Sequence, residues 1–227
     1  MDNNQETIEQ IISLEWDMFA SVNEGAEKAS CQEDPVTFEG MRKAQFDAWS
    51  ADAVTSYLDD LEKAQQSGRN LIAEKYIHMM ETTEPAKYKA LLSRIQIPSA
   101  IVRSLAREIT DTLLKQTILL FELYPYVSNC GRPLNSAYDY GSVSVETYQF
   151  GELLTYSEKT LSKLKEHIES LESDDISLAN TILENTVKFY GYESLDEAEA
   201  ATKAHADESE IQVSFGCSAC SDRECGI

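Results

Sequence analysis

The sequence is poor in the residues that make turns, with 9 glycines and 5 prolines in 227 residues. β-Sandwiches and β-barrels need many turns, and those turns are rich in glycine and proline. The scarcity of both residues therefore argues against an all-β fold and favours long helices. A hydrophobic content of 42% is ordinary for a globular protein and suffices for a buried core.

Basic residues are also scarce, since 19 Lys and Arg stand against 40 Asp and Glu, which gives a formal net charge of -21. A surface of that sign repels the phosphates that supply most non-specific affinity for nucleic acids. It also repels anionic lipid surfaces. We therefore expect neither nucleic acid nor a membrane as a partner.

Long apolar runs and a secretory signal are missing as well. The most apolar run, TILLFELYPYV at residues 117–127, contains Glu122 and a proline, and a membrane-spanning helix needs about 20 apolar residues. The opening MDNNQETIEQ lacks the basic and apolar segments of a signal peptide. We expect a soluble cytoplasmic protein, in which five cysteines are free thiols or metal ligands rather than disulfides.

Apolar residues recur at helical spacing through most of the chain. This spacing predicts helices over residues 6–22, 35–67, 70–82, 98–123, 145–171 and 178–189, and a capping box at Ser194–Glu197 predicts the start of a last helix. We predict one all-α, bundle-like domain over residues 5–207 and an extended tail over 208–227. Residues 124–144 form a long irregular loop in this prediction, and such loops are often functional.

Four segments of the sequence carry a resemblance to a known family. They are ASCQEDPVTFEGMRKAQFDAW, GRNLIAEKYIHMMETTEP, VSVETYQFGELLTYSEKTL and NTVKFYGYESLDEAE. Together they resemble a prokaryotic family catalogued as domain of unknown function 4125, over about residues 14–199. The resemblance implies a helical cytoplasmic domain, sometimes associated with nucleotidyltransferase-like domains, with no agreed activity. Two departures, Cys130 and the pair Gln149-Phe150, replace positive charges that the family pattern leads us to expect.

Most of the polar residues that we select as a candidate site lie in the segments of this resemblance. The candidate catalytic residues are Glu74, Glu146, Glu152, Tyr156 and Cys31. The candidate ligand-binding residues are Glu15, Arg42, Gln45, Trp49, Arg69, Asn70, Lys75, Tyr76, Arg132 and Tyr148. A carboxylate in an apolar pocket has a raised pKa and can act as a general acid or base, arginines can hold an anion bidentately, and a thiol near a helix start can be nucleophilic.

These residues support two interpretations. In the first, an interior pocket lined by carboxylates and arginines, beneath the 124–144 loop, binds or acts on a small polar ligand. In the second, the same side chains form a structural network that pins the loop onto the helices. Glu74, His78 and Glu81 share one helix face, which is a weak metal-site pattern with an exposed polar face as its alternative.

The end of the chain carries a separate cluster of thiols. Cys217-x-x-Cys220 is followed by Cys225, and these three sulfurs fall one short of the four ligands of a structural zinc site. The cluster predicts a tail that binds zinc or exchanges thiols, with an inert end as the alternative. A third hypothesis is a scaffold subunit that performs no chemistry and binds a protein partner.

Overall fold

The computed structural model describes residues 3–22, 30–129, 132–139 and 142–209. Over these residues the chain forms ten α-helices, three short 3₁₀-helices and no strand, which confirms the all-α prediction. The α-helices are α1 Asn3–Ala20, α2 Pro35–Asp47, α3 Ala51–Gln66, α4 Leu71–Thr83, α5 Pro85–Leu91, α6 Ala100–Leu123, α7 Val145–Leu153, α8 Glu158–Ser173, α9 Leu178–Phe189 and α10 Leu195–Ser209. The 3₁₀-helices are η1 Ser30–Glu33, η2 Leu92–Arg94 and η3 Ser136–Tyr138. None of the described helices is long and apolar enough to cross a membrane.

Short polar side chains start most of these helices by accepting a hydrogen bond from the first turn. The capping residues are Asp34, Ser50, Asn70, Ser99, Ser144, Ser157 and Ser177. The predicted start of the last helix at Ser194 is confirmed, because Ser194 Oγ accepts from Glu197 N at 3.2 Å. The Glu197 carboxylate accepts in return from the amide of Glu193, one residue earlier than expected, at 2.8 Å.

Two of the predicted helices are in fact pairs of helices. The prediction of one helix over 35–67 was wrong, since α2 ends at Asp47 and Ser50 caps α3. The prediction over 145–171 was wrong for the same reason, since α7 ends at Leu153 and Ser157 caps α8. Hydrophobic spacing continues across each break, so periodicity alone does not reveal it, whereas a serine cap ends one hydrogen-bond ladder and begins another.

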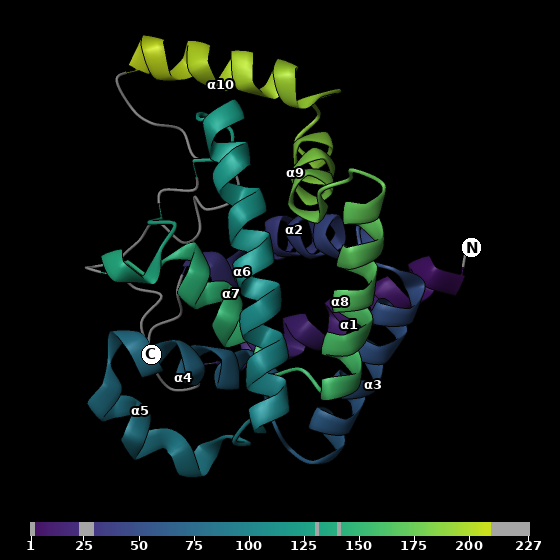
Figure 1. The fold of residues 1–227 in the computed structure, drawn as a ribbon, viewed down its shortest axis with the longest axis vertical. Coiled ribbons are helices and arrows are strands. Elements are labelled where there is room, and N and C mark those ends of the chain that lie inside the picture. Colours follow the sequence, from purple (N-terminus) through teal and green to yellow (C-terminus); the bar gives the residue numbers. More distant parts are fainter. Residues whose placement is uncertain (1–2, 23–29, 130–131, 140–141, 210–227) are drawn as a thin grey trace.

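The helices pack as a bundle (Figure 1), in which the long α6 packs against α7, α8 and α9. The pairs α1–α3, α3–α8, α6–α8 and α4–α7 pack against one another, and α2 packs on α9. Their shared core contains Ile8, Ile11, Phe46, Leu61 and Leu164, each with at most 1% of its surface exposed. Helix α10 lies across one end of α6 and α9 (Figure 1), over a smaller cluster that includes Val127, Val187, Leu195 and Ala198.

The connection between α6 and α7 is the irregular stretch that the sequence predicts, interrupted by η3. The Glu199 carboxylate of α10 accepts hydrogen bonds from the amides of Tyr126 and Val127. Near the other end, Asp139 accepts from Ser144 N at 2.6 Å and from the Thr147 hydroxyl at 2.7 Å. The connection is thus fastened to α10 at its start and to α7 at its end. The predicted tail beyond residue 209 lies outside the described residues.

Candidate functional site

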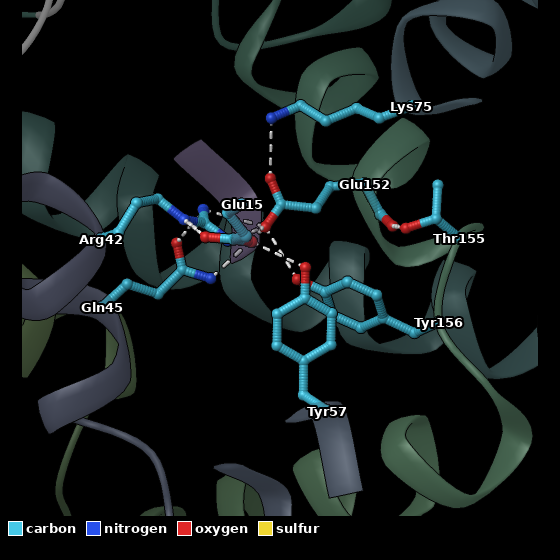
Figure 2. Close-up of polar contacts among 8 residues, drawn as sticks. All are labelled: Glu15, Arg42, Gln45, Tyr57, Lys75, Glu152, Thr155 and Tyr156. Atoms are coloured by element: carbon cyan, nitrogen blue, oxygen red, sulfur yellow. Dashed lines mark hydrogen bonds and ion pairs between the residues drawn. The ribbon is translucent and has the colours of Figure 1, made fainter. Parts of the chain in front are cut away.

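Two carboxylates and two cations meet in the middle of the bundle (Figure 2). Glu15 comes from α1, Arg42 from α2, Lys75 from α4 and Glu152 from α7. Glu15 is 0%, Lys75 4% and Glu152 8% exposed, so the charges are withdrawn from water. We call these four residues, with Gln45, Tyr57 and Tyr156, the ion-pair network.

Arg42 bridges the two carboxylates. Its Nε and Nη2 donate to Glu15 Oε2 and Oε1 at 2.7 and 2.5 Å, which is the bidentate geometry that planar guanidinium and carboxylate groups favour. Its Nη1 donates to Glu152 Oε1 at 3.1 Å and to Gln45 Oε1 at 3.0 Å. One guanidinium therefore fixes side chains from α1, α2 and α7.

The remaining bonds complete the neutralisation of the carboxylates. Lys75 Nζ donates to Glu152 Oε2 at 2.9 Å. The hydroxyl of Tyr156 donates to Glu152 Oε1 at 2.8 Å, and that of Tyr57 donates to Glu15 Oε1 at 2.7 Å. Two negative and two positive groups leave no formal net charge, which is the condition under which buried ions are tolerated.

A glycine allows α4 and α7 to come close enough for the Lys75–Glu152 bond. A Cβ added at Gly151 would lie 2.8 Å from Met79 Cγ and 3.1 Å from the backbone oxygen of Lys75. Both distances are shorter than normal carbon contacts, so only glycine fits without a shift. Gly151 thus sets the distance between α4 and α7, the helices from which Lys75 and Glu152 come.

Burial and neighbouring charges fix the protonation states of the network. Burial alone would raise the pKa of Glu152, but Arg42 and Lys75 outweigh it and hold that pKa well below its ordinary range. Burial and the carboxylate to which each donates raise the pKa of Tyr57 and of Tyr156 well above the ordinary value. The sequence interpretation of a general acid or base assumed a raised carboxylate pKa, and the shift at Glu152 has the opposite direction.

Half-buried Tyr76, Arg132 and Tyr148 lie around the buried Lys75 at the edge of the network, next to the α6–α7 connection. The Lys75 ammonium lies 3.6 Å from the centroid of the Tyr148 ring and 5.9 Å from that of Tyr76. The Arg132 guanidinium lies 5.3 Å from the same Tyr148 ring, and its Nη1 donates to Val143 O at 3.1 Å. We call Lys75, Tyr76, Arg132 and Tyr148 the rim.

Glu146 belongs to a separate contact that holds the α6–α7 connection. Its Oε1 accepts from Arg107 Nη1 at 2.8 Å, and its Oε2 accepts from the amide of Ser136 at 2.9 Å. Burial opposes these bonds, yet together they lower the pKa of Glu146. This geometry is the loop-pinning arrangement that the sequence left as an alternative. Arg107, which the sequence interpretation missed, also stacks on Phe150 at 4.0 Å.

Four more of the candidate residues hold helix ends or fill the core. Arg69 pairs bidentately with Glu74, with distances of 2.8 and 2.6 Å. Asn70 caps α4 and donates to Met18 O at 2.7 Å, which ties α4 to the end of α1. Trp49 is 6% exposed and packs edge-on against Phe46.

The possible metal face on α4 is not supported. The alternative of an exposed polar face was wrong for His78 and for Glu74, which are each 3% exposed. Within the described residues no group of three His, Cys, Asp or Glu side chains could hold a metal ion. The side chain of Cys31 and the tail cysteines Cys217, Cys220 and Cys225 lie outside what the structure describes.

Of the sequence-predicted residues, the structure therefore brings together Glu15, Arg42, Gln45, Lys75, Glu152 and Tyr156 in the network, with Tyr76, Arg132 and Tyr148 beside it. Tyr57 is an added member that the candidate residues chosen from the sequence did not include. The one clue in the sequence is that Tyr57 is a tyrosine, since a buried tyrosine hydroxyl usually finds a hydrogen-bond partner.

Comparison with known proteins gives a family and nothing finer. No curated protein matches the chain, and no solved structure matches it. A family model described as Protein of unknown function (DUF4125) matches residues 5–200, which confirms the resemblance that the sequence motifs indicated. The chain belongs to this DUF4125 family.

Proposed function

We propose that this domain binds a small polar ligand at the rim, with the ion-pair network as the rigid support behind it. The position of Lys75 carries the proposal. Its ammonium has three hydrogen-bond donors, and one of them donates to Glu152 at 2.9 Å. The remaining donors lie among Tyr148 and Tyr76, where a ligand oxygen can accept them.

The residues around Lys75 have the chemistry of a recognition site. Tyr148 and Tyr76 are half-buried, and a ring or a planar polar group can pack against the exposed part of each ring. The Arg132 guanidinium and the Lys75 ammonium both lie near the Tyr148 ring. Two cations this close together favour a ligand with anionic or carbonyl oxygens. Because Glu152, Arg42 and Tyr156 hold their positions by mutual bonds, Lys75 is oriented before the ligand arrives.

Binding fits this geometry better than acid–base catalysis does. A general acid or base works best with a pKa near the working pH. The pKa of Glu152 is lowered far below that range, and those of Tyr57 and Tyr156 are raised far above it. The network therefore supplies fixed charge and orientation rather than a mobile proton.

Native mass spectrometry of the full chain, after exposure to a mixture of small metabolites, tests this proposal. We expect a bound small molecule on the parent protein that is lost from a Tyr148→Leu variant. Phe121→Leu, a similar substitution on α6, is the matched control and should keep the bound mass. Equal binding to all three proteins, or no bound mass on any of them, would contradict a site at the rim.

A further inference from the structure

His78 is the one histidine of the described residues that is buried without a hydrogen-bond partner. Its side chain lies on α4 and is 3% exposed. Neither Nδ1 nor Nε2 has a partner among the described residues. An imidazole always carries at least one N–H, and leaving buried polar atoms unpaired is costly. Such a group in a folded protein calls for an explanation.

The segment that covers His78 is weakly held. Residues 81–101, which include α5 and η2, contain no buried side chain. Helix α5 packs on α4 at one end of the bundle (Figure 1), and its half-buried Tyr88 brings its ring centroid to 6.4 Å from the His78 ring. Elements with so few buried contacts open at low cost. We call residues 84–99 the α5 arm.

The charged groups that shift the pKa of His78 are two arginines. Arg103 and Arg69 both act on the imidazole, and with burial as the largest cause they lower the pKa of His78 to about 4. Arg69 is held in a bidentate pair by Glu74. Arg103 pairs with Glu81 at 3.0 Å, and both of these side chains are more than one-third exposed, which makes the pair weak.

We infer that His78, Tyr88 and Arg103 form a second ligand site, which takes the carboxylate group of a small organic acid. The imidazole N–H donates to one carboxylate oxygen, and the Arg103 fork donates to the same group in place of Glu81. The α5 arm admits the acid by moving away from α4 and closes Tyr88 over it. This site shares no residue with the rim, and it does not depend on the function proposed above.

The chemistry excludes the other simple occupants. A divalent metal would need further oxygen or nitrogen ligands, and the nearby carboxylates of Glu74 and Glu81 are paired with arginines. A cationic ligand would meet Arg69 and Arg103. A carboxylate satisfies the imidazole donor and can take the place of Glu81 on the Arg103 guanidinium.

Nuclear magnetic resonance of the full chain with isotopically labelled histidine tests this inference, because the chain has 3 histidines. Acetate is the probe, and neutral acetamide of the same shape is its control. We expect acetate to shift the ring-nitrogen signals of His78 saturably and to leave those of His167 in place, since His167 already bonds Ala48 O at 2.9 Å. Acetamide should cause no saturable shift.

Two variants sharpen the result. Glu81→Gln removes the competing carboxylate from Arg103, so we expect acetate to bind several-fold more tightly. In Arg103→Gln, which keeps His78 in place, the acetate-dependent shift should be lost. The inference is overturned if acetate leaves His78 unmoved, if acetate and acetamide act equally, or if Glu81→Gln weakens binding.

Discussion

The buried, unpartnered His78 predicts a specific loss of stability in mild acid. The pKa of a histidine is ordinarily 6.5, and burial together with Arg103 and Arg69 lowers that of His78 to about 4. Above pH of about 6.5 the imidazole is neutral in both the folded and the unfolded chain, so it has little effect. As the pH falls below that value, the unfolded chain takes up the proton first, and the free energy of unfolding decreases.

The size of the effect follows from the difference between the two pKa values. At about 1.4 kcal/mol for each pKa unit, the full loss is about 3 kcal/mol, reached when the pH falls to about 4. At pH of about 5 the loss is about 2 kcal/mol, which is a large part of the stability of an ordinary domain.

Urea unfolding of the parent protein and of a His78→Leu variant, at several values of pH, measures this loss. We expect the variant to be as stable as the parent at neutral pH or more stable, because leucine removes two unpaired polar atoms. The variant should lose about 2 kcal/mol less than the parent between pH of about 7 and about 5. The other two histidines are present in both proteins, so their contribution cancels. Parallel curves for the two proteins over this range would refute the reasoning.

Three further predictions concern the packing, the loop and the tail. Gly151→Ala should lower the free energy of unfolding by about 1–2 kcal/mol, because the new methyl group is forced against Met79 and the backbone of Lys75; unchanged stability would show that α4 and α7 do not pack as described. Glu146→Gln should speed limited proteolysis within residues 124–144, since it weakens the bonds to Arg107 and Ser136, whereas the exposed control Glu169→Gln should not. Protein purified without chelator should carry one zinc ion that Cys217→Ser removes; evenly alkylated free thiols would contradict the predicted metal tail.

The sequence predicted the helical part of the fold well because the physical signals are local. Residues 178–189 form a helix with the predicted limits, and Ser194 caps the next one as its motif indicates. The breaks at Ser50 and Ser157 were not predicted. Each serine begins a new helix while the apolar spacing continues, and serine is too common for its position alone to reveal a cap.

The sequence predicted candidate residues for the site, but not which of them contact one another. The candidate list contained Glu15, Arg42 and Glu152, which do converge. Which carboxylate meets which cation depends on packing between α1, α2 and α7, and no sequence period encodes it. For the same reason the sequence missed Arg107 as the partner of Glu146 and placed His78 on a face that could be exposed.

The direction of the pKa shifts is the point where sequence reasoning was most misleading. Burial was expected to raise the pKa of a carboxylate such as Glu152, as it does in an apolar pocket. The structure adds Arg42 and Lys75 at hydrogen-bond distance, and their charges reverse the shift. Composition and spacing do not contain this information, because it depends on which side chains touch.

A double-mutant cycle on Arg42 and Glu15 tests most directly the central claim that the buried charges neutralise one another. We expect Arg42→Met and Glu15→Gln each to cost about 3–5 kcal/mol of unfolding free energy, since each leaves a buried charge without its partner. The double variant should cost at least about 2 kcal/mol less than the sum of the two single effects. Small single effects that simply add would contradict the claim that Arg42 and Glu15 are a buried ion pair.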